Sequence, residues 1–92
     1  MQNKIFMYVL CPEHNFSYNI IRHQTNYLLN KYKKYNIQHK FIEPKKNTYQ
    51  KILTDYDIFS YPSYIIQKDK SRIVYNGTDI NKVENYLINY VN

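Results

Sequence analysis

The segment Lys4–Leu10, KIFMYVL, is the feature that most constrains the fold of this chain. It is apolar almost throughout and mixes β-branched with aromatic side chains, which is typical of a strand buried on both faces of a sheet. Such a strand needs neighbouring strands at its edges and helices over its two faces. We therefore expect Lys4–Leu10 to be the central strand of an α/β domain.

The rest of the chain alternates between helix and strand patterns. Apolar residues recur at helical spacing from Phe16 to Tyr35, which predicts a long amphipathic helix ending in a basic stretch. Residues 37–44 alternate and stop at a proline, so they predict a second strand. The remaining patterns predict a short helix capped by Asn47 or Thr48, followed by strands at 60–67 and 72–77. They also predict a last helix that is capped by Thr78 or Asp79. Its apolar stripe is Ile80, Val83, Leu87 and Val91.

The resulting order is β-α-β-α-β-β-α within a single domain, residues 1–92. The long helix between the first two strands predicts that they are parallel, and the polar turn between the last two strands predicts an antiparallel hairpin. A four-stranded mixed sheet with helices on both faces is the economical packing of these elements.

Composition narrows the classes of function. The chain has a net charge of +6 and 17% aromatic residues, and its lysines cluster between Lys31 and Lys51. This pattern fits a solvated basic face better than a site for a polyanion. Nucleic acid is therefore not an expected partner. The longest apolar run is far shorter than the roughly 20 residues that span a bilayer, and the N-terminus lacks a cleavage signal. We expect a cytoplasmic protein with no membrane partner.

The only cysteine, Cys11, directly follows the first predicted strand. One cysteine excludes an internal disulfide. Pro12 suits the first position of a helix, and Glu13 suits its positive end. If a helix begins there, its unpaired N–H groups favour the Cys11 thiolate and lower the pKa of the thiol.

Three segments together resemble the thioredoxin superfamily. A cysteine stands where that family carries its redox motif, in FMYVLCP. The family's segment in which a proline with a cis peptide bond begins a strand resembles DIFSYPSYIIQKDKSRIVYNG. The family's glycine turn and last helix are similar to NGTDINKVENYLINYV. The chain departs from the family at the motif itself, CPEH, where His14 stands in place of the second cysteine.

The resemblance implies roles for these residues. Cys11 is the expected nucleophile of a monothiol thioredoxin-like or glutaredoxin-like protein that acts in thiol-disulfide exchange, and His14 modulates it. Tyr61 and Pro62 are expected to bind an extended substrate backbone through main-chain hydrogen bonds. The partner is then a disulfide-bearing or thiol protein, or glutathione as co-substrate, with no permanently bound cofactor. The family also implies that the turn Gly77, Thr78 and Asp79 binds glutathione.

Each of these roles has an alternative reading. Cys11 also fits a small buried residue, His14 a solvated one, and Gly77–Asp79 a plain turn and helix cap. A second register places Asn15–Tyr18, NFSY, at the motif position with no cysteine. No metal site is expected, because Cys11 and His14 supply only two ligands. The alternative function is a redox-inactive binding module with the same fold, which holds a protein partner in the groove beside Pro62.

Overall fold

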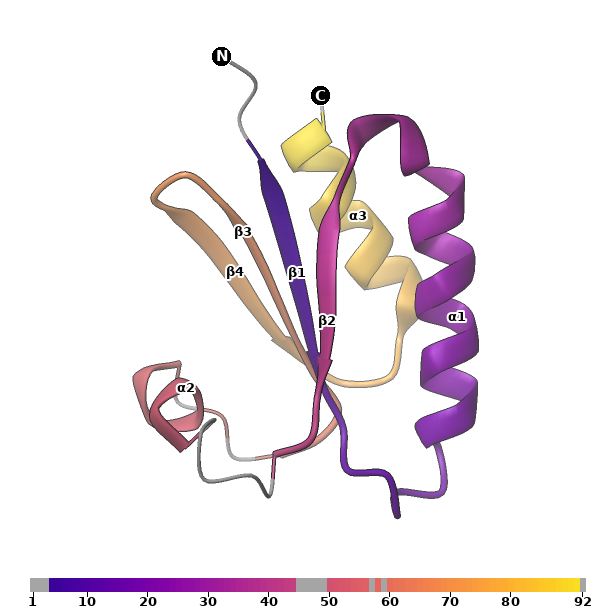
Figure 1. Ribbon diagram of the computed structural model, residues 1–92, viewed down its shortest axis with the longest axis vertical. Helices are drawn as coiled ribbons and strands as arrows, with labels where there is room; N and C mark the ends of the chain where they lie inside the picture. The colour runs from indigo at the N-terminus through magenta and orange to yellow at the C-terminus, as the bar shows by residue number, and fades with distance from the viewer. Residues whose placement is uncertain (1–3, 45–49, 57, 59, 92) are drawn as a thin grey trace.

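The computed structural model describes residues 4–44, 50–56, 58 and 60–91, and its element order is the one predicted from the sequence (Figure 1). The elements are β1 (Ile5–Leu10), α1 (Tyr18–Lys31), the 3-10 turn η1 (Lys33–Tyr35), β2 (Gln38–Ile42), α2 (Gln50–Asp55), β3 (Ser63–Lys68), β4 (Ser71–Asn76) and α3 (Ile80–Val91). The predicted caps Asn47 and Thr48 lie outside the described residues.

The four strands form one mixed sheet in the order β2-β1-β3-β4. β1 pairs with β2 in parallel and with β3 antiparallel, and β3 and β4 form the antiparallel hairpin. The predicted central position of β1, the parallel first pair and the terminal hairpin are all confirmed. Because β1 and β2 run in parallel, their carboxyl ends meet at one edge of the sheet, where β3 begins.

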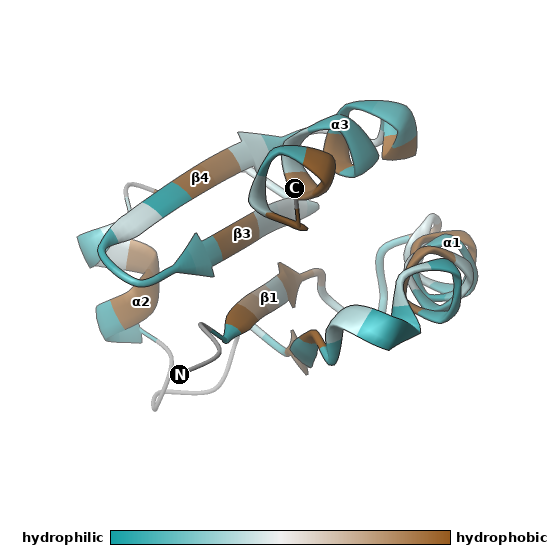
Figure 2. Cartoon of the chain, turned by 90° about the horizontal axis from the view of Figure 1, so that it is seen from above, coloured by the Kyte–Doolittle hydropathy of each residue, from teal (hydrophilic) through white to brown (hydrophobic). Residues whose placement is uncertain are grey.

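Helices cover both faces of the sheet, as Figure 2 shows. α1 and α3 pack on one face over a cluster that includes Met7, Val9, Leu28 and Leu87, all at most 2% exposed. The short α2 packs on the other face over a smaller cluster formed by Leu10, Ile42, Ile58 and Ile65. The predicted α/β class, a four-stranded mixed sheet with helices on both faces, is confirmed.

The first helix begins later than the sequence predicts. Pro12 is not its first residue, because the chain makes two successive turns before α1 starts at Tyr18. The Asn15 N–H donates to the Pro12 carbonyl oxygen at 3.0 Å, and the Asn15 side-chain oxygen accepts the Ser17 N–H at 2.9 Å. These turns use the polar groups that a helix over the same residues would need, which is a common competition for asparagine.

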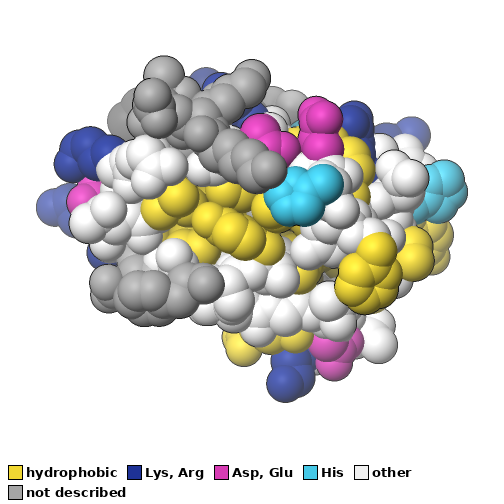
Figure 3. Space-filling view, turned by 90° about the horizontal axis from the view of Figure 1, so that it is seen from below, with side chains coloured by type: hydrophobic (Ala, Val, Ile, Leu, Met, Phe, Trp, Pro, Cys, Tyr) yellow, Lys and Arg dark blue, Asp and Glu magenta, His cyan; other side chains and the backbone are white. Residues whose placement is uncertain are grey.

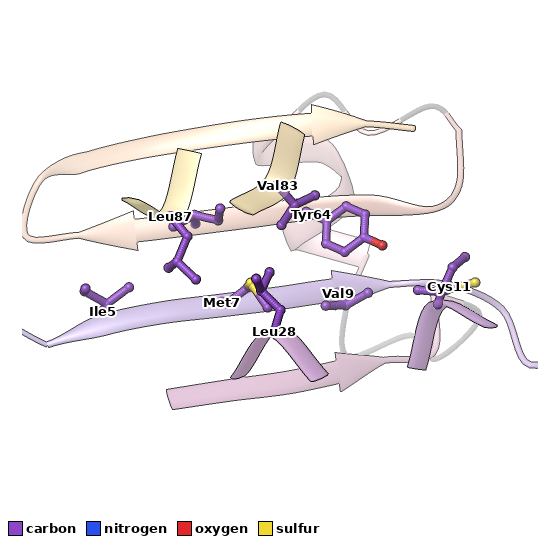
Figure 4. Packing of buried hydrophobic residues seen from close by; sticks show 10 residues of the cluster. Ile5, Met7, Val9, Cys11, Leu28, Tyr64, Val83 and Leu87 are labelled. Carbon is purple, nitrogen blue, oxygen red and sulfur yellow. The ribbon is translucent and has the colours of Figure 1, made fainter. Parts of the chain in front are cut away.

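A buried tyrosine hydroxyl lies between the sheet and α1. Tyr64 on β3 is fully buried, and its ring points along the cluster toward the Cys11 end (Figure 4). Burial raises the pKa of Tyr64 to about 12, and the neighbouring Thr25 hydroxyl acts in the opposite direction. Neither hydroxyl has a partner at hydrogen-bonding geometry among the described residues. An unpartnered buried hydroxyl costs stability.

Replacing Tyr64 with phenylalanine tests this cost. We expect Tyr64→Phe to raise the free energy of unfolding near neutral pH by about 1 kcal/mol, measured by urea denaturation. Because the folded state holds the Tyr64 proton more tightly than the unfolded chain, wild-type stability is complete below about pH 10 and falls as the pH rises toward about 12. Tyr64→Phe lacks this titrating hydroxyl, so its free energy of unfolding should fall less than that of the wild type between about pH 10 and pH 12.

Tyr27→Phe is the matched control, since Tyr27 is 71% exposed on α1. It should leave both the neutral and the alkaline stability within about 0.5 kcal/mol of wild type. A loss of stability of 1 kcal/mol or more in Tyr64→Phe would mean that the hydroxyl is satisfied, contrary to this account.

Candidate functional site

The candidate site lies where β1 and β2 end and β3 begins. Leu10 at the end of β1 pairs with Ser63 at the start of β3. Cys11 directly follows Leu10 and Pro62 directly precedes Ser63, so the two residues lie at the same end of these antiparallel strands. Figure 3 views this end of the molecule, where hydrophobic side chains gather in the middle with a histidine and acidic side chains beside them. The fold therefore brings the predicted residues around Cys11 and Pro62 to one place.

Cys11 is part of the core at this end. It is only 1% exposed, its N–H donates to the Ile42 carbonyl oxygen at 3.3 Å, and its thiol donates to the Pro12 carbonyl oxygen at 3.7 Å. Burial raises the pKa of the Cys11 thiol, and the nearby Glu43 carboxylate raises it further. The thiol is therefore held in its neutral form, which is a poor nucleophile.

The predicted lowering of the Cys11 pKa is wrong. That prediction required a helix to begin at Pro12, whereas α1 begins at Tyr18 with Ser17 as its N-terminal flanking residue. A helix dipole acts mainly within the first turn, and Cys11 stands seven residues before α1. The segment that leads into α1 is that of the alternative register, Asn15–Tyr18, which ends on the first helical residue and contains no cysteine.

His14 is exposed in the turns between β1 and α1. Because no helix runs through Cys11–His14, the expected spacing of one helical turn between the two side chains does not apply. Among the residues that the structure describes, no three histidine, cysteine, aspartate or glutamate side chains gather as a metal site.

Glu43 is the site residue that the sequence prediction missed. Its carboxylate accepts the Glu13 N–H at 3.0 Å. Burial is the larger cause of the raised pKa of both Cys11 and Tyr61, and the Glu43 charge raises both further. A signal for it was present, because Glu43 directly follows β2 and parallel strands end at the same edge of a sheet. The carboxylate gives this end of the molecule negative charge where a reactive thiol would need positive charge.

Tyr61 and Pro62 form the opposite wall of the site. The peptide bond between them is cis, Pro62 is buried and Tyr61 is half-buried. The Pro62 carbonyl accepts the Gly77 N–H at 3.1 Å, whereas no described residue hydrogen-bonds to the main chain of Tyr61. Pairing with another chain would therefore break no hydrogen bond between the Tyr61 main chain and a described residue.

Gly77, Thr78 and Asp79 form a turn and a helix cap. Gly77 has a φ of 150°, a backbone conformation that residues with a Cβ rarely adopt, so the position favours glycine. The Tyr75 hydroxyl accepts the Asp79 N–H at 3.2 Å, while the Asp79 carboxylate accepts the Asn81 N–H at 3.0 Å. Thr78 is exposed between them. The Asp79 N–H and carboxylate thus each make a hydrogen bond within the turn, at an exposed residue.

Comparison with known proteins identifies the fold but no close relative. No protein-family model matches the chain, and no curated protein matches it. Among solved structures it is similar to a designed protein, with 20% identity, a TM-score of 0.80 and coverage of 99% of this chain and 79% of that one. It is also similar to thioredoxin-2 of the malaria parasite, with 15% identity, a TM-score of 0.78 and coverage of 97% and 85%.

A third similar structure is the germline-specific thioredoxin Deadhead of Drosophila melanogaster, with 16% identity, a TM-score of 0.79 and coverage of 94% of this chain and 80% of that one. At these identities the likeness concerns the fold alone. The chain therefore has the thioredoxin fold. Its site differs from a thiolate centre because Cys11 is buried, His14 lies exposed before the helix, and the Glu43 charge disfavours the thiolate. None of its described helices has the length and apolar character to cross a membrane.

The effect of Glu43 on the thiol can be measured directly. We expect Glu43→Gln to lower the pKa of Cys11, because the substitution removes a negative charge that disfavours the thiolate. The pKa should stay above the ordinary value of about 8.5, since burial is the larger cause and remains. The pH dependence of the iodoacetamide alkylation rate gives the Cys11 pKa of the wild type and of the variant.

Asp55→Asn is the matched control for this measurement. The Asp55 carboxylate pairs with Lys51 on α2 at 2.9 Å and does not affect the Cys11 thiol. An unchanged Cys11 pKa in Glu43→Gln, or an equal shift in Asp55→Asn, would contradict the assigned role of Glu43.

Proposed function

We propose that this chain is a redox-inactive binding module with the thioredoxin fold, which holds an extended segment of a protein partner along the main chain at Tyr61. The segment pairs with the Tyr61 N–H and C=O as an added strand, and the surface beside Pro62 receives its side chains. Binding by main-chain hydrogen bonds needs no thiol.

The observation that carries this proposal is the state of Cys11. The only thiol in the sequence, that of Cys11, belongs to a residue that is 1% exposed, and both burial and Glu43 raise its pKa. Thiol-disulfide exchange requires a thiolate that can reach the disulfide sulfur in line. Both requirements are opposed here, whereas strand addition is supported by a Tyr61 main chain to which no described residue hydrogen-bonds.

The competing function is the monothiol exchange expected from the sequence. In that reaction the Cys11 thiolate attacks one sulfur of a partner disulfide, the partner's S–S bond breaks, and a mixed disulfide forms as the other sulfur leaves as a thiolate. A thiol from glutathione or a second protein must then resolve the mixed disulfide. The position of Cys11 opposite Pro62 favours this function, and the raised pKa and burial of the thiol disfavour it.

A peptide with selected N-methyl groups separates these functions. A peptide ligand is first selected from a random library on the full chain, and each of its amides is then methylated in turn. We expect methylation of one amide, the one that donates to the Tyr61 carbonyl oxygen, to lower the affinity about 2- to 12-fold, which is the range of one net hydrogen bond, while the other amides tolerate methylation. Isothermal titration calorimetry gives the affinities.

Cys11→Ser is the companion variant, because it removes the thiol and nearly preserves the volume of the side chain. The selected peptide should bind this variant as it binds the wild type. Equal tolerance of methylation along the whole peptide, or a loss of binding in Cys11→Ser, would refute main-chain recognition without the thiol.

A further inference from the structure

A second surface lies on the sheet face that α2 covers only in part. α2 is six residues long, and in Figure 1 it lies level with the lower ends of the strands. The cluster beneath it contains Leu10 and is packed by Tyr8, but Phe6 belongs to neither core cluster. The half of this face around Phe6 is therefore left uncovered by the described helices.

The strand register defines which side chains share this face. Phe6 pairs with Gln38 on β2 and with Gln67 on β3, Gln67 pairs with Arg72 on β4, and Tyr8 pairs with Lys40 on β2. We call this set the sheet platform: Phe6, Tyr8, Gln38, Lys40, Gln67 and Arg72. Lys4 continues the same alternation at the start of β1.

The centre of the sheet platform is aromatic. Phe6 and Tyr8 are both half-buried, and together with residues 38–40 of β2 they line a hollow of about 190 Å³. The two rings stand two residues apart on one strand, so they are spaced by about 6.7 Å. This is about twice the 3.4 Å rise between stacked bases of a duplex, and the spacing suits bases that have been separated from one another.

The rim of the sheet platform is cationic. Lys40 and Arg72 are exposed on the two edge strands, and the Arg72 guanidinium lies 4.6 Å from the centroid of the Tyr56 ring. No acidic residue occupies any position of β1–β4 on this face, while Gln38 and Gln67 offer amide groups. The chain as a whole carries a net charge of +6.

We propose that the sheet platform binds single-stranded nucleic acid, with bases stacked on Phe6 and Tyr8 and phosphates paired with Lys4, Lys40 and Arg72. Aromatic rings on a sheet face within a cationic rim are what single-strand recognition requires, because any base can stack and every nucleotide carries a phosphate. An acidic peptide would satisfy the cations but would leave the two rings without a stacking partner. This site is independent of the main-chain site at Tyr61.

Fluorescence anisotropy with a labelled oligothymidylate of about 12 nucleotides tests the proposal on the full chain. We expect binding that weakens about 20-fold between about 50 and 200 mM salt, as three phosphate contacts predict for a single strand. A duplex of the same length should bind more weakly. Phe6→Leu and Tyr8→Leu should each lower the affinity about fivefold or more, because each removes a stacking ring and retains an apolar side chain.

Matched controls separate the sheet platform from general charge and aromaticity. Tyr27→Leu changes an exposed ring on α1, which covers the opposite face, and Phe16→Leu changes an exposed ring in the loop before α1. Both variants should bind as the wild type does. Lys40→Gln should weaken binding, whereas Lys33→Gln, an equal charge change in η1, should have a smaller effect. If the ring variants do not fold, by circular dichroism, Arg72→Gln against Lys33→Gln gives the same comparison.

Three outcomes would overturn the proposal. One is the absence of binding at low salt, and another is equal effects of the platform and control variants. The third is displacement of the oligonucleotide by polyglutamate at equal charge concentration, which would identify a surface for acidic proteins instead.

Discussion

The pairing of β1 with β2 on one edge and β3 on the other is the interaction on which the rest of the structure depends. β1 is hydrogen-bonded along both edges and carries Met7 and Val9 toward α1 and α3, and Leu10 toward α2. Because β1 and β2 are parallel, the chain must leave both at the same end of the sheet. That end therefore gathers Cys11, Glu43 and the segment before β3, although they are distant in sequence.

The chemistry of the site follows from how firmly this end is packed. Cys11 continues the sheet by donating its N–H to Ile42, so its side chain belongs to the core and is removed from water. Burial and a neighbouring carboxylate raise the pKa of a thiol, whereas a helix N-terminus lowers it. The late start of α1 and the presence of Glu43 thus change what the same scaffold can do. The main chain at Tyr61, to which no described residue hydrogen-bonds, lies at the same end.

The sequence predicts the framework of the fold because the strongest signals are periodic. The apolar run of β1, the stripe containing Val83 and Leu87, and the proline that precedes β3 each indicate their element without tertiary information. The start of α1 is missed because Pro12 suits either a helix or a turn, and the hydrogen bonds of Asn15 decide for the turn. The burial of Cys11 and its proximity to Glu43 depend on strand pairing, so the residue pattern around CPEH does not reveal them.

We infer that Cys11 is a packed residue of the sheet end and does not act in thiol-disulfide exchange. Mass spectrometry of the chain after exposure to oxidised glutathione, with and without urea, tests it most directly. We expect the glutathione adduct on Cys11 to form slowly in the folded protein and readily in the denatured one, since unfolding exposes the thiol and separates it from Glu43. Rapid and complete formation of the adduct in the folded protein would contradict the account and favour monothiol exchange.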